Sequence, residues 1–163
     1  MNKSNYPKPV ILVTSRATVD ILGRETIKDN VMTLTWHMPC SFNPGLYAIS
    51  IGKQRFSLKL IKESRAFVVN FIPASFKDKA EYCGNYSGEH IDKFDKAKLA
   101  KEECDTIDCC RLSEAIAYIE CEVVNEIEAG DHIIFIGKVL NSMIKDHNKC
   151  LYHLQGDKYT TTL

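Results

Sequence analysis

Residues 47–61, YAISIGKQRFSLKLI, run from an apolar strand through a short polar turn directly into an amphipathic helix. The first N–H groups of a helix have no partner inside the helix, and the helix dipole places roughly half a positive charge at that end. Lys53, Arg55 and the hydroxyl groups of Ser50 and Ser57 surround this helix start. The stretch therefore predicts a site for an anion such as a phosphate group. The alternative is that Ser57 caps the helix while Lys53 and Arg55 are solvated.

Length and charge limit the class of protein. The chain has 163 residues, the size of one domain, and we expect a single domain over residues 1–163. Twenty-one basic residues balance twenty-one acidic ones, which argues against nucleic acid or an anionic membrane as a partner. No apolar run approaches the roughly 18 residues of a membrane span, and the polar N-terminus has no signal-peptide core. We expect a cytoplasmic protein.

The chain has seven cysteines, an odd number without any C-x-x-C pair, which argues against a disulfide scaffold. Three of them, Cys104, Cys109 and Cys110, lie in a charged connector. Their spacing with His132 or His147 matches no standard zinc ligand set, so we expect no metal site. The role of these three thiols stays open between free thiols and a redox function.

Strand patterns outnumber helical ones. Strands are predicted at residues 10–15, 18–22, 31–37, 46–51, 66–71, 115–127 and 132–144, with a short one from residue 151. Helices are predicted at residues 54–63 and 75–83, with a further short one near residues 96–103. The pattern favours a mainly β fold, a small antiparallel barrel with accessory helices. An α/β sandwich, with residues 54–63 as a crossover helix, is the structural alternative.

Several segments follow one another in order between Pro9 and about Val139. They are PVILVT at 9–14, NVMTLTW at 30–36 followed by Ser41 and Pro44, residues 50–57 leading to FVVNFIP at 67–73, CGNYSG at 83–88 with DKF at 92–94, and ECE at 120–122 with GDHIIFIG at 130–137. Their order and spacing resemble the flavin reductase-like family of FMN-binding split barrels, which includes the flavoredoxins. The resemblance implies an antiparallel, Greek-key-like split β-barrel with FMN as cofactor. The Cys104 to Cys110 connector departs from the family pattern.

The resemblance assigns the FMN phosphate to the strand-to-helix turn. A guanidinium fork and helix N–H groups suit a dianion, and the turn offers both. The positions implied are Ser50, Ile51, Gly52, Arg55, Phe56 and Ser57. Lys53 is expected to be peripheral.

The resemblance assigns the pyrimidine edge of the flavin to the main chain of Thr33, Leu34 and Thr35, with the Thr35 hydroxyl as a further donor. Open main chain offers alternating N–H and C=O groups, and an N–H near the ring oxygen stabilises negative charge on a reduced flavin. Trp36, the only tryptophan, is expected to border the ring. The alternatives are ordinary strand threonines on a wet face and a tryptophan that anchors a core or an interface.

Five more residues are implied from the matching segments. Asn70 lies near the cofactor in the family pattern, and Ser87, Gly88 and Lys93 belong to a loop that approaches the flavin, often across a subunit boundary. His132 is the candidate catalytic residue, as a group that hydrogen-bonds substrate or orients a nicotinamide. The alternatives are a strand-end cap for Asn70, a solvated loop for residues 87–93 and a structural histidine.

The resemblance implies an NAD(P)H-dependent flavin reductase, in which hydride passes from the nicotinamide to the flavin and the reduced FMN hands electrons on. Because the chain has no G-x-G-x-x-G fingerprint, NAD(P)H is expected to bind transiently in an open cleft. The alternative is a flavoredoxin-like carrier, which passes electrons between proteins without efficient NAD(P)H oxidation. A third possibility is a binding module of this barrel type without flavin. A homodimer is expected, with a redox partner protein or free flavin as acceptor.

Overall fold

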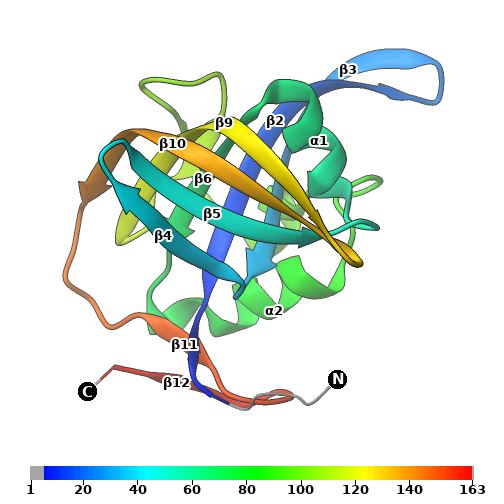
Figure 1. The fold of residues 1–163 in the computed structure, drawn as a ribbon. Helices are drawn as coiled ribbons and strands as arrows, with labels where there is room; N and C mark the ends of the chain where they lie inside the picture. The colour runs from blue at the N-terminus through cyan, green and yellow to red at the C-terminus, as the bar shows by residue number, and fades with distance from the viewer. Residues whose placement is uncertain (1–5, 163) are drawn as a thin grey trace.

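Strands dominate the structure, a computed structural model that describes residues 6–162 (Figure 1). The strands are β1 (Lys8–Pro9), β2 (Ile11–Ile21), β3 (Arg24–Leu34), β4 (His37–Phe42), β5 (Gly45–Gly52), β6 (Ala66–Phe71), β7 (Lys101–Glu103), β8 (Cys110–Leu112), β9 (Ala117–Ala129), β10 (His132–Ile144), β11 (Leu151–His153) and β12 (Tyr159–Thr161). The helices are α1 (Phe56–Ser64), α2 (Lys77–Asn85) and α3 (Lys93–Ala97), with a 3₁₀ turn η1 at Ala74–Phe76. The predicted mainly β fold with accessory helices is confirmed.

Seven strands form one antiparallel sheet in the order β3-β2-β6-β9-β10-β5-β4. A second sheet, β1-β11-β12, lies below it in Figure 1, at the end where α2 lies. Among the described residues no pairing joins β3 to β4, so the large sheet curves without closing. β5 and β6 run antiparallel to each other because two strands separate them in this order. Helix α1 is therefore not a parallel crossover, which removes the α/β sandwich alternative.

The prediction of two strands at residues 10–15 and 18–22 is wrong, because β2 is one continuous strand. It pairs with β3 along its whole length through a two-residue turn, Leu22-Gly23. Both turn residues have a positive φ, 54° for Leu22 and 79° for Gly23, as tight hairpin turns require. The Gly23 N–H donates to the carboxylate of Asp20 at 2.7 Å. The hairpin extends beyond the sheet at the upper right of Figure 1.

The chain leaves the sheet at Thr35 and Trp36, between β3 and β4. Met32 and Leu34 are buried, but the Trp36 side chain is 42% exposed. The single strand predicted at residues 31–37 is therefore wrong, because β3 ends at Leu34 and β4 begins at His37. The break leaves the main chain of these two residues outside the regular ladder.

The short helix predicted near residues 96–103 begins earlier, at Lys93. Asp92 caps it by accepting hydrogen bonds from the N–H groups of Phe94 and Asp95, at 2.9 and 3.2 Å. The helix ends at Lys98, whose φ is 51°, and residues 101–103 form β7 instead. Because the helix starts early, Lys93 lies against α2 and β3.

The core consists of two layers on the two faces of the large sheet. One layer is enclosed by the curved sheet and contains Ile11, Val13, Ile49, Phe67, Val69, Cys121 and Phe135. The other lies between the sheet and α2, α3, β8 and β11, and contains Val10, Leu12, Val31, Ile72, Phe76, Leu112 and Leu151. Helix α1 packs Leu60 against Ala17 and Val19 of β2. None of the helices within residues 6–162 has the length and apolar character needed to cross a membrane.

Candidate functional site

Three adjoining hollows form a cleft along the edge where β3 ends and the small sheet begins. The Trp36 hollow, about 600 Å³, and the Tyr159 hollow, about 570 Å³, share the lining residues Thr35, His153 and Gly156. The Tyr159 hollow and the smaller Lys93 hollow, about 180 Å³, share the lining residues Thr33, Arg55, Gly84 and Asn85. The shared walls make the three hollows one continuous cleft.

The start of α1 forms one wall of the Lys93 hollow. Arg55 is the N-cap residue, in an extended conformation, and within the described chain no side chain caps this helix. Ser57 is buried in the first turn, and its hydroxyl accepts a hydrogen bond from the Asn30 amide at 2.8 Å. Ser57 therefore does not cap the helix, and the first N–H groups of α1 are available to a ligand.

Lys93 lies on the opposite wall of this hollow and is 5% exposed. Its ammonium group donates to the carbonyls of Val31 and Cys83, at 2.8 and 2.7 Å, so one of its three N–H groups remains for another acceptor. Burial lowers the pKa of Lys93 to about 8, the Cys83 thiol opposes this, and the nearby positive charge of Arg55 lowers it further. The ammonium group is thus desolvated and poised beside a second cation.

Gly88 lines the Lys93 hollow and lies so close to the Asn30 side chain that only glycine fits at this position. A Cβ at this position would lie 1.9 Å from the amide oxygen of Asn30 and 3.4 Å from Cε of Lys93. Both contacts belong to side chains that line the hollow. The absence of a side chain at Gly88 therefore keeps the loop of residues 86–88, which includes Ser87, against the helix start.

The Lys93 hollow is positively charged. Of its described lining residues, Arg55 and Lys93 carry charge and none is acidic. Within residues 6–162 no ion pair joins either cation to a carboxylate. Lys53, by contrast, forms an ion pair with Glu128 at the end of β9 and lies outside the lining of the cleft. The arrangement suits an anion with several acceptor oxygens.

The main chain at the end of β3 lines the middle of the cleft. Thr33, Leu34 and Thr35 all contribute to the Tyr159 hollow. The Thr33 hydroxyl donates to the Ala80 carbonyl at 2.5 Å, so its side chain holds α2 rather than a ligand. The Trp36 carbonyl accepts from the Ser50 N–H at 2.9 Å, which keeps the open segment beside β5. Thr35 lines both the Trp36 hollow and the Tyr159 hollow.

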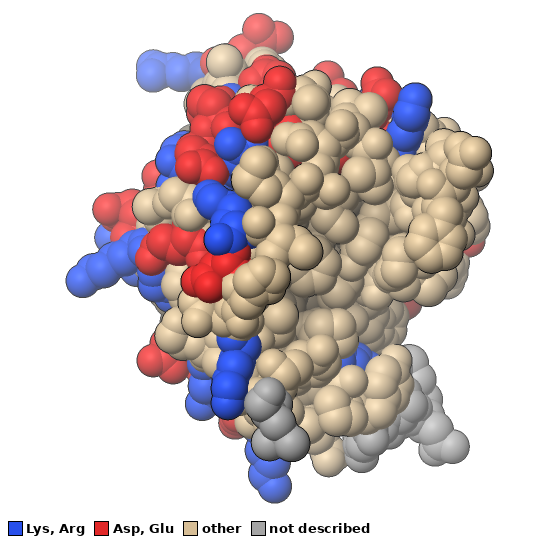
Figure 2. Space-filling model, turned by 90° about the vertical axis from the view of Figure 1, so that its left-hand side faces the viewer, with Lys and Arg blue, Asp and Glu red and all other residues tan. Residues whose placement is uncertain are grey.

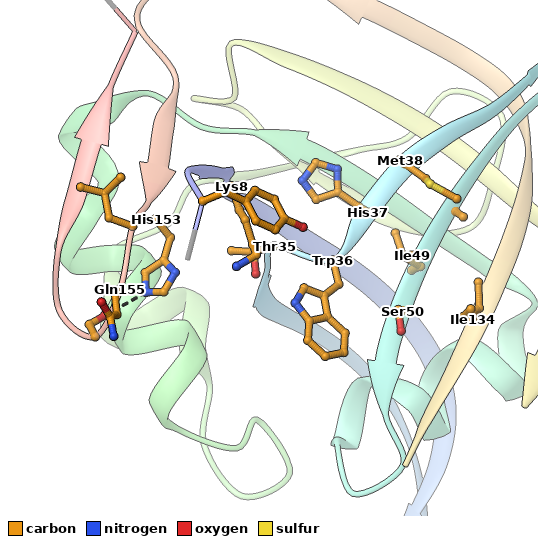
Figure 3. A pocket seen from close by; sticks show the side chains of 14 residues that line it. Lys8, Thr35, Trp36, His37, Met38, Ile49, Ser50, Ile134, His153 and Gln155 are labelled. Atoms are coloured by element: carbon orange, nitrogen blue, oxygen red, sulfur yellow. Dashed lines mark hydrogen bonds between the residues drawn. The ribbon is translucent and has the colours of Figure 1, made fainter. Parts of the chain in front are cut away.

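The Trp36 hollow has aromatic and polar walls (Figure 3). Trp36 and Ser50 lie on one side of it and His153 and Gln155 of the small sheet on the other, with Thr35 between them. The ring of His132 packs against Trp36, with 4.7 Å between ring centroids and an angle of 30° between the planes. The structure therefore places Ser50 beside Trp36 and not in the Lys93 hollow with Arg55 and Ser57.

His132 lies at the start of β10, next to the cleft. Its Nδ1 atom is 2.7 Å from the Asp131 carboxylate, which fixes the ring orientation. The hydrogen bond and the positive charge of a protonated His132 lower the pKa of Asp131. His132 reaches the cleft through its contact with Trp36.

Three of the predicted cofactor-binding residues, Asn70, Ile51 and Gly52, do not line the three hollows. Asn70 is fully buried, and its amide joins β6 to Leu12 of β2 at 3.0 Å and to the N–H of Leu112 at 2.8 Å. The side chain of Ile51 lies in the core. The Gly52 carbonyl accepts from the Arg55 N–H at 2.9 Å and so closes the turn before α1. Phe56 lines the Lys93 hollow.

Several lining residues were not predicted. His37 lines the Trp36 hollow, and its ring nitrogens lie 2.7 Å from the Tyr47 hydroxyl and 3.1 Å from the Pro9 carbonyl. Burial lowers the pKa of His37, which keeps the ring neutral. Further unpredicted lining residues include Asn30, Asn85, His153, Gln155 and Tyr159. The last three reach the cleft because β11 pairs with β1. These two strands lie near opposite ends of the sequence, so no local sequence pattern indicates that they pair.

A family model and several known proteins match this chain. The family model described as "Flavin reductase like domain" matches residues 1–162. An uncharacterized protein of Archaeoglobus fulgidus is 37% identical over 114 residues, which are 70% of this chain and 64% of that protein. The chain spans between about half and about two thirds of the length of such archaeal relatives.

Two solved structures share the fold over nearly the whole chain. The flavoredoxin of Methanosarcina acetivorans has a TM-score of 0.82 at 23% identity, covering 99% of this chain and 89% of that one. The NADH:FAD oxidoreductase SgcE6 of Streptomyces globisporus, in complex with NAD and FAD fragments, has a TM-score of 0.82 at 21% identity, covering 98% of this chain and 87% of that one. These likenesses confirm the predicted split-barrel fold.

Proposed function

The chain belongs to the flavin reductase-like domain family, and from this premise we propose that it binds FMN in the cleft and passes electrons through it, with NADH or NADPH as the hydride donor. One observation carries the proposal. Arg55 and Lys93 face a hollow at the start of α1 in which no described lining residue is acidic. Lys93 is buried, and a buried cation without a carboxylate partner is costly unless a ligand supplies the negative charge.

The Lys93 hollow fits a phosphate group. The guanidinium group of Arg55 offers a planar fork, Phe56 and Ser57 at the uncapped start of α1 line the same hollow, and Lys93 retains one N–H. Gly88 leaves room where a Cβ would collide with Asn30. We assign the phosphate tail of FMN to this hollow, held by Arg55, Lys93 and the main chain of Phe56 and Ser57.

The wider part of the cleft fits a flat heterocycle. The main chain of Thr33, Leu34 and Thr35 offers N–H and C=O groups for a pyrimidine edge, and Trp36 offers a ring face. A bound flavin supplies the hydride and electron chemistry. The chain's own part is to hold the ring, to exclude water from one side and to place an N–H near the ring oxygen where negative charge accumulates.

NAD(P)H is proposed as a transient substrate in the Trp36 hollow. SgcE6, which shares the fold, is described as an NADH:FAD oxidoreductase and was solved with NAD and FAD fragments. His132 packs on Trp36 at the edge of this hollow, and its orientation is set by Asp131. We assign to His132 the role of hydrogen-bonding the nicotinamide amide.

The second candidate function is a flavoredoxin-like carrier that receives its electrons from a protein partner. The flavoredoxin of Methanosarcina acetivorans shares the fold over 99% of this chain, which favours this candidate as much as SgcE6 favours a reductase. Both functions use the same flavin site. They differ in whether NAD(P)H reduces the bound flavin directly.

Two measurements test these proposals. Titration of flavin-free protein with FMN is expected to quench flavin fluorescence with one FMN per chain, and to do so more tightly than titration with riboflavin, which lacks the phosphate. Failure of FMN to bind would overturn both functions. Anaerobic addition of NADH or NADPH to the FMN-loaded protein is then expected to bleach the visible flavin absorbance within seconds. Bleaching with dithionite or reduced ferredoxin alone would instead identify a carrier.

We further propose a homodimer with the flavin near the interface. Large apolar side chains are exposed on β4 and at the end of β10, namely Met38, Phe42, Met143 and Ile144. Figure 2 views the molecule from the side where these strands lie, and uncharged side chains cover much of that face, while most charged side chains lie toward the left and the top of the view. Apolar patches of this kind mark interaction surfaces. Light scattering is expected to give twice the 18.5 kDa chain mass, and a monomer that binds FMN equally well would overturn the proposal.

A further inference from the structure

The connector between β7 and β8 brings two cysteines opposite each other. The register pairs Glu103 of β7 with Cys110 of β8. One step further along, the N–H of Cys104 donates to the carbonyl of Cys109 at 3.0 Å. Cys104 and Cys109 are therefore the last facing pair of this hairpin, and residues 105–108 form its loop. None of these residues lines the three hollows of the cleft.

The two thiols lie on the same face of the hairpin. Facing residues of antiparallel strands project to the same side, with Cα atoms about 4.5–5.5 Å apart, which lies within the range that a disulfide spans. Both side chains pack in one small cluster with Val68 and Tyr118. The pair has the placement that a disulfide needs.

Cys110 is adjacent in sequence but packs elsewhere. Its side chain belongs to the core layer with Val10 and Leu112, on the other side of the strand from the cluster that holds Cys109. Its carbonyl accepts from the Thr14 hydroxyl at 2.6 Å, which fixes its main chain to β2. Cys110 is therefore not the partner that the fold offers to Cys109.

The loop between the two cysteines is held in place by Glu120. The buried carboxylate of Glu120 accepts from the N–H and hydroxyl of Thr106, at 3.0 and 2.6 Å, and from the N–H of Asp105 at 3.2 Å. These bonds fix the loop while the thiols are reduced. Two reacting groups held side by side react as an intramolecular pair, without first having to be brought together.

We propose that Cys104 and Cys109 are a redox-active dithiol that forms a reversible disulfide with small-molecule disulfides as the oxidant, at a site separate from the flavin cleft. The thiolate of Cys104 attacks the external disulfide, which breaks that S–S bond and releases one thiol. Cys109, after losing its proton to solvent, then attacks the sulfur of Cys104 and releases the second thiol. Two cysteine thiols are oxidised to one disulfide, and one external disulfide is reduced to two thiols.

Cys104 is the residue that reacts first. Its side chain is partly exposed, whereas Cys109 is 1% exposed. The neighbouring thiols of Cys104 and Cys110, and after them burial, raise the pKa of Cys109 well above that of a free cysteine, and a raised pKa leaves less of the reactive thiolate. The oxidant therefore meets Cys104, and Cys109 resolves the mixed disulfide.

The test is to equilibrate the full-length protein in oxidised and reduced glutathione at several ratios, alkylate the free thiols, digest with trypsin and analyse the peptide of residues 102–111. This peptide, EECDTIDCCR, contains all three cysteines of the connector. In the oxidised sample we expect a loss of two hydrogens and alkylation at Cys110 alone. A peptide that has lost two hydrogens but carries the alkyl group on Cys104, or full alkylation of all three cysteines at every ratio, would overturn the proposal.

Three variants sharpen the test. Cys110→Ser is expected to keep the loss of two hydrogens, whereas Cys104→Ser and Cys109→Ser are each expected to abolish it. Cys104→Ser changes a partly exposed residue, so it remains usable if the buried Cys109→Ser does not fold. The FMN dissociation constant is expected to differ by less than twofold between oxidised and reduced protein. A larger difference would contradict the separation of this site from the cleft.

Discussion

The cations of the cleft and the cations beside the β7–β8 hairpin have opposite surroundings. Arg16 pairs with Asp29, Glu103 and Asp108 at 2.6, 2.6 and 3.0 Å. Arg111 pairs with Glu102, Asp105 and Glu120 at 2.8, 2.7 and 2.6 Å. No such partner faces Arg55 or Lys93 within residues 6–162.

The pKa values follow this difference. Hydrogen bonds to carboxylates raise the pKa of Arg16 and, against the desolvation that burial brings, that of Arg111. Burial lowers the pKa of Lys93 to about 8. A buried cation surrounded by carboxylates therefore contributes to the fold. A buried cation without a carboxylate partner marks a site whose negative charge comes from a ligand.

Removing Arg111 is expected to have the largest effect, and on stability alone. In Arg111→Met the fully buried Glu120 carboxylate loses its charged partner, which costs about 3 kcal/mol in the free energy of unfolding. Urea denaturation measures this loss, and FMN titration is expected to give an unchanged dissociation constant. A fall in FMN affinity with unchanged stability would reverse the assignment of the two regions.

Removing Arg55 is expected to have the opposite pattern. Arg55 is exposed and has no carboxylate partner in the described chain, so Arg55→Ala changes the free energy of unfolding by only about 0.5 kcal/mol. Loss of a charged hydrogen bond to phosphate weakens FMN binding by about 1.5–3 kcal/mol. Lys53→Ala is the matched control, because Lys53 pairs with Glu128 outside the cleft. Equal FMN affinities for all three proteins would remove Arg55 from the site.

The fold was predictable where one strand face is buried. Alternation marks β9 and β10, and the prediction for residues 132–144 agrees with β10 at both ends. It fails inside β2, where the polar residues Ser15 and Arg16 interrupt the apolar pattern. Ala17 and Val19 beyond them are buried again against Leu60, so the interruption is not a strand end.

The candidate site was predictable where it is local in sequence. The strand, turn and helix that present Arg55, Phe56 and Ser57 are contiguous, so the anion site could be inferred from residues 47–61. Asn30 and His153 were not predictable, because antiparallel pairings with distant segments bring them to the cleft. Asn70 was misjudged, because a polar residue on an apolar strand also arises where an amide joins two strands inside the core.

Filling the space at Gly88 is expected to have an intermediate effect that is specific to the cleft. In Gly88→Ala the new Cβ would lie 1.9 Å from the Asn30 amide oxygen, so the loop of residues 86–88 must move outward. The expected loss is about 1–2 kcal/mol of FMN binding free energy, measured by fluorescence titration. Gly45→Ala is the control, because its Cβ would meet Val139 at an ordinary 3.6 Å. If both variants bind FMN equally, the close approach at Gly88 does not shape the site.

The smallest effect is expected in the pH dependence of Lys93, where binding and stability change in opposite directions. Below a pKa of about 8 the ammonium group is charged and attracts the phosphate dianion, so FMN binding is expected to weaken about fivefold between pH 7 and 9. The flavin-free protein behaves in the opposite way. The unfolded chain keeps the Lys93 proton up to the ordinary pKa of 10.5. The contribution of Lys93 to the free energy of unfolding therefore increases as the pH rises from 8 to 10.5.

Lys93→Met separates these two effects from every other titration in the protein. The variant keeps the apolar stem of the side chain but cannot titrate, so both pH dependences are expected to flatten while Arg55 stays charged throughout. Its free energy of unfolding near pH 7 is expected to equal or exceed that of the unaltered protein, because the cost of burying a charge is gone. FMN titrations and urea denaturation at pH 7, 8 and 9 measure both. If the FMN affinity of the unaltered protein is constant over this pH range, Lys93 donates only to its two carbonyl partners, Val31 and Cys83. Lys93 would then have a structural role, as Arg111 has, and no role in FMN binding.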